Sequence, residues 1–521
     1  MASLEKAAVL IPMLPAAAAF CIAAGIALGR LEGESCERVS ARIALAALGA
    51  SGLLALLLLV LGSAGILDAR TVLGTWLASA DYRVLLSLQL DRLSSGLSVL
   101  IALMAYLVAH FSIDYMHRER GFHRFFLVLS LFTGAMQLLV LAGNPVLTFF
   151  GWELAGVCSY LLIAYAYDRP VAAGNATRAF LTNRVGDAGL VLAIALSFAW
   201  TGQLEWSRLL AGLARLSPEK QNLVAACFLV AAFAKSAQVP FSPWLARAME
   251  GPTPSSTLFY GALMIHAGVY LVLRLEPLFA QAEAVSALMA AAGLATALYG
   301  YFCGLSQTDV KSALAFSTLA QVGLMFLACG LGFWQLAFWH LFAHAVVRGH
   351  QFLAAPGLMH ALSGQPPRPL PAWLAKSRRG YAASLNRFWL EPAVDRACVL
   401  PVQRLADDFD AFDRRVLDRL LDAPVPAVQA LAALANWEER RIGVPLGAEA
   451  ERQIGGLPAW IVARTADVLH WFEDRLVLRG VGLDLWRAGR RLGRALQRLE
   501  ALLAEPRYVC LVLLISLFAV G

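Results

Sequence analysis

A series of long apolar runs restricts the fold of this chain more than any other feature. Each run has about 18 or more residues, the length at which a helix crosses the roughly 30 Å of hydrocarbon in a bilayer. About a dozen such runs lie near residues 7–28, 43–67, 91–112, 124–143, 146–167, 178–200, 222–247, 254–275, 284–304, 310–332, 334–356 and 506–520. The strands of a membrane barrel would alternate apolar and polar side chains over about ten positions, and these runs do not. The sequence therefore predicts an all-α polytopic membrane protein with about 12 transmembrane helices.

The composition agrees with a membrane protein and gives no sign of a redox centre. Of the 521 residues 59% are hydrophobic and 15% are charged, and the mean hydropathy is +0.64, far from the composition of soluble globular proteins. The eight cysteines form no CxxC pair and lie mostly inside apolar runs, which is typical of packed thiols. Motifs that bind nucleotides, flavin or NAD are missing as well. We therefore expect no cofactor in this chain.

The basic residues predict the orientation of the chain in the membrane. Arginine and lysine gather in the loops after the first, third, fifth and eleventh spans and before the tenth, and these loops all fall on one side. Cytoplasmic loops carry such an excess of basic residues, so the net charge of +7 needs no nucleic-acid partner. The opening MASLEKAAVL lacks the basic region of a cleavable signal peptide, and the first span is expected to remain. We expect a bacterial inner-membrane protein with its N-terminus outside.

A polar segment interrupts the series of spans at residues 357–505. It holds 39 of the 79 charged residues, 21 basic and 18 acidic. Its apolar residues keep helical spacing, which predicts several amphipathic helices on the cytoplasmic side. In LWRAGRRLGRALQRLEALL five arginines share one helix face. This helix could lie on an anionic lipid bilayer or pack on a protein partner, and the pattern favours the two equally.

Ionisable residues inside the apolar runs are the candidates for function, because a charge in the bilayer centre costs at least about 3 kcal/mol. Glu153 stands in the middle of FGWELAGVCSY, and Lys235 ends an apolar half-helix that Pro240 and Pro243 then interrupt. Proline frees backbone carbonyls, which membrane-embedded chains tolerate only where protein or water satisfies them. A broken helix with a lysine at the break predicts an ion path.

Further ionisable residues extend this set. They are Arg184 and Asp187 in one span, His266 in another, Asp309 and Lys311 at the start of the tenth, and His340, His344 and Arg348 in the eleventh. Carboxylate, amine and imidazole groups on neighbouring helices can pass a proton along, because neutralising one group changes the cost of charging the next. The pattern therefore predicts a proton relay.

Simpler interpretations stay open for some members of this set. Glu153 and Lys235 could form a static ion pair, and Asp309 and Lys311 could lie at the membrane edge. Two histidines four residues apart, such as His340 and its neighbour one turn later, also have the spacing of zinc ligands. With no third ligand in the sequence pattern, no metal site is expected.

Six stretches resemble the antiporter-like subunits of respiratory complex I, above all its L subunit, and the large subunit of multi-subunit sodium/proton antiporters. They are FFGWELAGVCSYLLIAYAY, AFLTNRVGDAGL, AKSAQVPFSPWLARAMEGPTPSS, AGVYLVLR, QTDVKSALAFSTLAQVGLMFLACG and HLFAHAVVRG, within residues 80–356. The resemblance implies that Glu153 is an ion-pair glutamate, Lys235 a central lysine and Asp187 with Arg184 a modulating charge pair. It also implies that His340 and His344 form a lateral relay.

The chain departs from the pattern of these subunits in three ways. The family has a lysine where this chain has Arg348, and a histidine where it has Tyr260, with His266 one and a half turns later. Arginine does not readily release its proton, so it can steer a proton but hardly carry one. The family also has two inverted five-helix repeats, and here the second is truncated. The implied parts are N-terminal helices 1–120, a complete repeat 121–275, a truncated repeat 284–356, the cytoplasmic segment 357–505 and a last helix 506–521.

The resemblance implies two functions. Shortened members serve as the membrane subunit of a DAB-type inorganic carbon transporter, whose large soluble, zinc-containing partner resembles a carbonic anhydrase. In that case zinc belongs to the partner, and proton flow drives the uptake of CO2 as bicarbonate. The alternative is an L-type subunit of a proton-pumping NADH:quinone oxidoreductase or of a cation/proton antiporter, with other complex I membrane subunits as partners. A passive scaffold with purely structural buried charges is the third possibility.

Overall fold

The computed structural model describes residues 5–79, 82–361, 364 and 370–412. Nine helices in this part of the chain are long and apolar enough to cross a membrane. Two more predicted spans are present as the interrupted pair α9 and α10 and as α16 (Trp334–Ala361). The prediction of an all-α polytopic membrane protein is confirmed for this part. The predicted span 506–520 lies outside the described residues.

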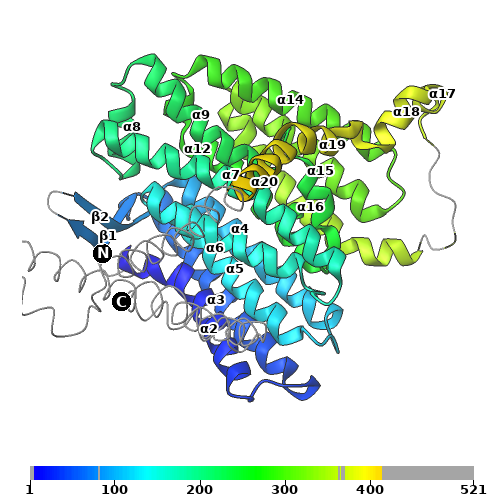
Figure 1. Ribbon diagram of the computed structural model, residues 1–521. Helices are drawn as coiled ribbons and strands as arrows, with labels where there is room; N and C mark the ends of the chain where they lie inside the picture. The colour runs from blue at the N-terminus through cyan, green and yellow to red at the C-terminus, as the bar shows by residue number, and fades with distance from the viewer. Residues whose placement is uncertain (1–4, 80–81, 362–363, 365–369, 413–521) are drawn as a thin grey trace, which may run out of the picture. The chain divides into compact units, whose positions relative to one another are not determined.

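Most helices follow one another with short connections, and the longer connection at residues 64–91 contains the strands β1 (Arg70–Ser79) and β2 (Tyr82–Gln89) (Figure 1). The helices before the break in the seventh span are α2 (Leu10–Ala27), α3 (Glu37–Ser63), α4 (Arg92–Tyr115), α5 (Phe122–Leu141), α6 (Pro145–Ile163), α7 (Pro170–Thr201), α8 (Trp206–Leu213) and α9 (Pro218–Lys235). Those after it are α10 (Pro243–Arg247), α11 (Thr253–Ser256), α12 (Ala267–Arg274), α13 (Glu276–Phe279), α14 (Glu283–Leu305), α15 (Val310–Gly330) and α16. Helix α5 is almost wholly buried and packs mainly against α2 and α6, with further contacts to α4 and α3.

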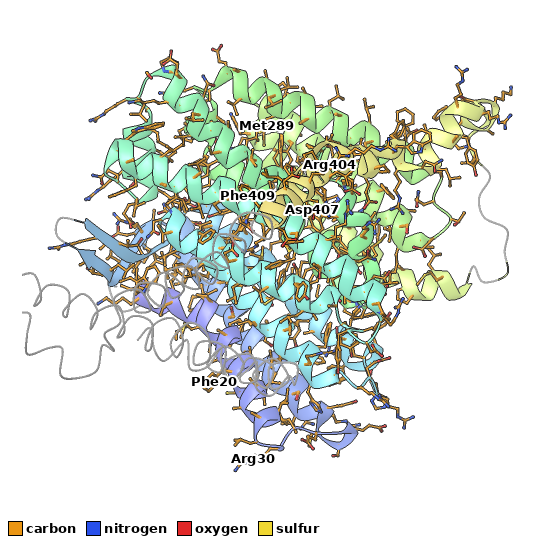
Figure 2. The ribbon with its side chains drawn as sticks, in the orientation of Figure 1. Phe20, Arg30, Met289, Arg404, Asp407 and Phe409 are labelled. Carbon is orange, nitrogen blue, oxygen red and sulfur yellow. The ribbon has the colours of Figure 1, made fainter. Side chains whose placement is uncertain are left out.

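The chain divides into two compact units, and the described residues up to Glu391 belong to the first. The polar segment begins there with α17 (Ala372–Lys376) and α18 (Arg378–Leu385), and α19 (Leu390–Val394) includes the boundary between the units. In the second unit α20 (Leu400–Phe412) carries the exposed side chains of Arg404, Asp407 and Phe409, which Figure 2 labels. The prolines expected to interrupt the helices of this segment, Pro424, Pro426, Pro445 and Pro458, lie outside the described residues. The arginine-rich stretch near residue 490 lies outside the described residues.

Side-chain caps fix where several spans begin. Asp91 accepts a hydrogen bond from Ser94 N at 2.9 Å, and Asn144 accepts one from Leu147 N at 2.9 Å. Each cap satisfies an amide that has no partner inside its helix. Proline at the first position of α6, α7 and α9 helps in the same way, since its missing amide would have been unpaired there.

Helices α14 and α15 approach each other through glycines seven residues apart. A Cβ atom added to Gly293 would lie 2.5 Å from Leu327 N, and one added to Gly300 would lie 2.6 Å from Ala320 N. On α15 a Cβ at Gly323 or Gly330 would meet the backbone of α14 at 2.6 or 2.5 Å. Small residues that let backbones approach closely are the usual means of packing helices in membranes.

Replacing Gly300 by alanine is expected to destabilise this helix pair, because backbone atoms on α15 cannot move aside as a flexible side chain would. The expected loss is about 1–3 kcal/mol of unfolding free energy. Gly304→Ala is the matched control on the same helix, where the added methyl would meet Phe316 Cβ at an ordinary 3.5 Å. Thermal unfolding in detergent compares the two. Equal stability of both variants would contradict the close approach.

A β-hairpin stands between α3 and α4, which the sequence analysis did not predict. Strand β1 (Arg70–Ser79) pairs antiparallel with β2 (Tyr82–Gln89), with two register shifts along β1. The buried carboxylate of Glu205 anchors it: Arg70 Nη2 and Ser87 Oγ donate to Glu205 Oε2 at 2.6 and 2.7 Å, and Asn144 Nδ2 donates to its other oxygen at 3.2 Å. This charge is therefore paired and structural.

Candidate functional site

The seventh span is broken at Lys235, as the prolines predict. Helix α9 ends at Lys235, residues 236–242 are not helical, and α10 starts with Pro243. Protein groups satisfy the carbonyls that the break frees: Trp244 Nε1 donates to Ala234 O at 3.0 Å, and Ser242 Oγ donates to Ala237 O at 2.7 Å. The interrupted backbone is thus compatible with membrane depth.

Lys235 is fully buried at this break, with 1% of its surface exposed. Its Nζ donates to the backbone carbonyl of Trp152 at 3.0 Å and lies 5.0 Å from the centre of the indole ring. The indole Nε1 of Trp152 in turn donates to Asp187 Oδ1 at 2.7 Å. Trp152 therefore links the ammonium group on α9 to the carboxylate on α7.

Arg184 joins the remaining members of the cluster. Its guanidinium forms an ion pair with Glu153 on α6, and its Nε lies 3.0 Å from Asp187 Oδ2, one helical turn along α7. Gly156 leaves the space for both cations: a Cβ there would lie 3.3 Å from Lys235 Nζ and 3.4 Å from Arg184 Nη2. Glu153, Arg184, Asp187 and Lys235 are thus brought together from three helices.

The pairing inside this cluster differs in one respect from the sequence hypothesis. Glu153 contacts Arg184, and the hydrogen bond of Lys235 goes to a carbonyl, so Arg184 and Trp152 stand between the two expected partners. Two positive and two negative groups balance, which lowers the cost of burial. Glu153 Oε1 is buried and has no hydrogen-bond partner among the described residues. A bare carboxylate oxygen in a low-dielectric site is a natural place to add a proton.

The eighth span is interrupted too, which the sequence analysis missed. After α11 it continues as a π-helix (Thr257–Ala262) and a 3-10 turn (Met264–His266) before α12 begins. This irregular stretch points His266 at α16, where its Nε2 lies 2.9 Å from His344 Nδ1. π-helical turns are common at functional sites.

The hydrogen bonds assign the protons of this histidine pair. His266 Nδ1 faces the carbonyl of Ala262 at 2.9 Å and must donate to it, because a carbonyl can only accept. In the neutral pair, His266 Nε2 therefore accepts from His344 Nδ1. His344 Nε2 is buried and has no partner among the described residues. A proton arriving there can be matched by one moving on to His266.

His340 and Arg348 lie on α16 with His344, and each is hydrogen-bonded to a residue of α15. The ring centres of His340 and His344 are 6.3 Å apart, and His340 Nε2 donates to Gln321 Oε1 at 2.9 Å. Arg348 Nη2 donates to Ser317 Oγ at 2.7 Å.

Asp309 and Lys311 lie at the start of α15. Asp309 caps α15 by accepting from Ser312 N at 2.8 Å, and Lys311 Nζ lies 3.4 Å from Gly251 O. The contacts of Asp309 fit a helix cap at the membrane edge.

Within the described ranges, no group of three or more His, Cys, Asp or Glu side chains is arranged to hold a metal ion. The site as described consists of two hydrogen-bonded groups of protein side chains, one around Lys235 and one around His344. Among the residues that the structure covers, Glu153 Oε1 in the first group and His344 Nε2 in the second are buried acceptor atoms without a hydrogen-bond partner. Such an arrangement can take up, hold and release protons.

Comparison with known families identifies the class of protein that carries this site. Residues 142–367 match the family described as NADH:quinone oxidoreductase/Mrp antiporter, transmembrane part, and residues 76–126 match the N-terminus of chain 5 of complex I. The matched ranges include both broken spans and both side-chain groups. The chain belongs to the family of antiporter-like membrane subunits of complex I and Mrp antiporters.

Individual relatives give the same assignment. The chain is 38% identical to a chloroplast NAD(P)H-quinone oxidoreductase subunit 5 from Nephroselmis olivacea over 68% of its own length and 55% of that protein. It is 40% identical to NADH-quinone oxidoreductase subunit L of Mycobacterium tuberculosis over 61% of its own length and 51% of that protein. The chain thus spans about half the length of these curated relatives.

Two solved structures share the fold. A chain of the Mrp complex from Dietzia sp. is 29% identical, with a TM-score of 0.59 over 69% of this chain and 39% of that one. A chain of the archaeal membrane-bound sulfane sulfur reductase is 19% identical, with a TM-score of 0.60 over 74% of this chain and 80% of that one. The second likeness concerns the fold alone.

Proposed function

We propose that this chain conducts protons through the buried charges around Lys235, as a subunit of a larger membrane assembly of the complex I and Mrp kind. One observation carries the proposal. At the helix break, ion pairs and hydrogen bonds connect Glu153, Arg184, Asp187, Trp152 and Lys235 in one continuous series. Buried charges of this kind are expensive inside a membrane and usually mark an ion or proton path.

The contacts suggest how proton uptake at Glu153 acts on Lys235. While Glu153 is ionised, it shares Arg184 with Asp187, and Asp187 keeps part of its negative charge to stabilise the ammonium group. When a proton neutralises Glu153, Arg184 loses that partner and turns fully to Asp187. The field that held the proton on Lys235 then weakens, and the lysine releases its proton. Uptake at one end of the cluster thereby drives release at the other.

The histidines provide the next step of the proposed path. The released proton reaches the partner-free Nε2 of His344, and His344 Nδ1 passes its own proton to His266. Neutral imidazole can exchange protons in this way near neutral pH. Arg348 stays charged and steers the proton without carrying it.

We infer that the partners are other membrane subunits, because the proteins that this chain resembles are named as subunits or components of complexes. In this leading version the chain is the L-type subunit of a proton-pumping quinone oxidoreductase or of a cation/proton antiporter. The predicted orientation puts its N-terminus outside a bacterial inner membrane.

Inorganic carbon uptake with a soluble, zinc-containing, carbonic-anhydrase-like partner is the second candidate. The polar segment 357–505 favours it, because 39 charged residues in one cytoplasmic stretch could dock a soluble protein. In this version the proton path would be the same. Proton flow would drive the conversion of CO2 to bicarbonate by the soluble partner, and no redox reaction would be involved.

Purification from the native membrane with whatever accompanies the chain tests both versions. The assembly is reconstituted into vesicles, and a trapped pH dye reports proton flux along an imposed gradient. We expect flux in either case. Flavin or iron-sulfur subunits in the preparation would support the oxidoreductase, and a zinc-bearing soluble subunit would support carbon uptake. An assembly that conducts no protons contradicts the proposal.

A further inference from the structure

Basic side chains from four separate stretches of the chain line one cavity at the start of α15. Its volume is about 500 Å³, and its lining includes Arg169 before α7, Arg247 at the end of α10, Lys311 in the first turn of α15 and Arg387 in the turn before α19. Liquid water takes up about 30 Å³ per molecule, so the cavity has room for a hydrated polar group. Arg169 and Lys311 belong to the basic loops that the sequence places on the cytoplasmic face.

The lining of this cavity carries an excess of positive charge. Its four basic residues stand against one carboxylate, that of Glu250. Arg169 Nη2 already pairs with Glu250 Oε2 at 3.2 Å. Arg247 Nε lies 2.5 Å from Glu391 Oε1, and this same oxygen lies 3.0 Å from Arg178 Nε. The nearby carboxylates are therefore already engaged by arginines.

Lys311 and Arg387 form no ion pair with any carboxylate among the residues that the structure covers. Lys311 Nζ has one long hydrogen bond, to Gly251 O at 3.4 Å, and an ammonium group can donate three. The guanidinium of Arg387 lies 5.3 Å from the centre of the Phe316 ring and makes no hydrogen bond to a described residue. Both side chains are half-buried. Two cations thus line the cavity with donors to spare.

The excess of basic residues on cytoplasmic loops does not by itself require a ligand, because water can solvate them. Arg30, in the loop after α2, is such a case, with its side chain exposed. Arg387 is held in place instead. It and the next two residues have φ angles of 52°, 52° and 50°, a left-handed backbone that is unfavourable for residues with a Cβ atom. The ring of Phe388 packs 6.3 Å from those of Tyr299 and Phe302. Strained backbone of this kind gathers at ligand sites.

We propose that this cavity binds a phosphate group, with Lys311 and Arg387 as its main ligands. The group belongs to an anionic phospholipid headgroup or to free inorganic phosphate, which present the same oxyanion. The planar fork of arginine matches two phosphate oxygens, and lysine adds a point charge. The bound group would connect α15 with the turn before α19. Basic cavities between helices on the cytoplasmic side are suited to headgroups. The proposal does not depend on the proposed function.

Binding of inorganic phosphate to the native assembly in detergent tests the first source. Equilibrium dialysis with radiolabelled phosphate is run in sodium chloride at constant ionic strength, so that screening is equal in all samples. We expect saturable binding that weakens about tenfold or more in Lys311→Gln and in Arg387→Gln, since hydrogen bonds to charged groups contribute at least that factor. Arg30→Gln is the matched control, an exposed arginine on the same predicted face, and should bind as the unsubstituted chain does.

Phospholipid bound to the same preparations tests the second source, because a resident headgroup would keep free phosphate out. Lipid is extracted from each purified assembly, and its phosphorus is quantified per chain. If the headgroup is the ligand, the double variant Lys311→Gln with Arg387→Gln should lose a tightly bound phospholipid. The unsubstituted chain and Arg30→Gln should retain it.

The outcomes decide between the sources and against the site. Phosphate binding that both single substitutions weaken supports the site with free phosphate, and a phospholipid lost only from the double variant supports it with a headgroup. Equal phosphate and lipid content in all variants overturns the site, as does an equal loss in Arg30→Gln. If Arg387→Gln loses subunits of the assembly, Arg387→Lys replaces it and should still bind more weakly, because lysine lacks the planar fork. Normal binding in Arg387→Lys would then overturn the site.

Discussion

Replacing Lys235 by alanine is expected to lower proton flux by about a hundredfold or more, because it removes the group that releases the proton to the histidines. Lys235→Arg should be nearly as inactive. Arginine preserves the charge beside Trp152 O and Asp187, and it does not give up its proton at accessible pH. Flux in vesicles with a trapped pH dye measures both variants.

The pair of substitutions separates a relay from a static ion pair. Removing one buried charge from a balanced cluster costs about 3–5 kcal/mol, so Lys235→Ala should also unfold at a lower temperature. Lys235→Arg should keep more of this stability. If Lys235 were purely structural, arginine would restore flux together with stability, and that result contradicts the proposed role. Lys220→Ala, an exposed lysine at the start of the same helix, is the control for a neutral substitution.

Glu153→Gln is expected to reduce flux by about tenfold to a hundredfold, because a neutral amide cannot take up a proton. Arg184 would then pair with Asp187 alone, which corresponds to the proposed proton-loaded state of the cluster. The variant should therefore fold, with its cluster held in one state. Flux and thermal unfolding are measured on the same preparation.

The exposed Glu283 at the start of α14 provides the matched control for this change of glutamate to glutamine. Glu283→Gln should keep normal flux. A Glu153→Gln protein that loses thermal stability but conducts protons normally would support the static ion pair, the alternative that the sequence leaves open. A protein that retains its stability and loses flux would support the relay.

The break at Lys235 could be predicted from the sequence because its cause is local. Pro240 and Pro243 remove amide donors, and the lysine before them is incompatible with lipid contact, so neighbouring residues already specify an interrupted, protein-lined span. Neighbouring residues do not specify partners across helices. The packing of α6, α7 and α9 determines the contacts of Glu153 and Lys235. It places Trp152 and Arg184 between them.

The interruption of the eighth span shows the same limit. The π-helical stretch Thr257–Ala262 contains no proline. The apolar residues of this span therefore predict one continuous helix. Packing against α16 and the contact between His266 and His344 accompany the irregular backbone. The ion pair between Asp91 and Arg274 could not be predicted either, because the two residues lie 183 positions apart and each stands at the end of an apolar run, where charges are ordinary.

The β-hairpin was missed for a different reason. Its residues lie between two apolar runs and include the charged side chains of Asp81 and Arg83, which disfavour a span. The irregular register between Val72 and Leu77 also obscures the alternation that would signal a strand. Its anchor, Glu205, comes from a loop more than a hundred residues later. Pairing over that distance cannot be deduced from composition or periodicity.

The central claim is that the buried carboxylate of Glu153 takes up a proton as protons flow, and infrared difference spectroscopy of the reconstituted assembly tests it most directly. Spectra are recorded with and without an imposed pH gradient. The account predicts a carbonyl band of a protonated carboxylic acid that appears with the gradient and is missing in Glu153→Gln. Identical difference spectra for the unsubstituted chain and Glu153→Gln would contradict it.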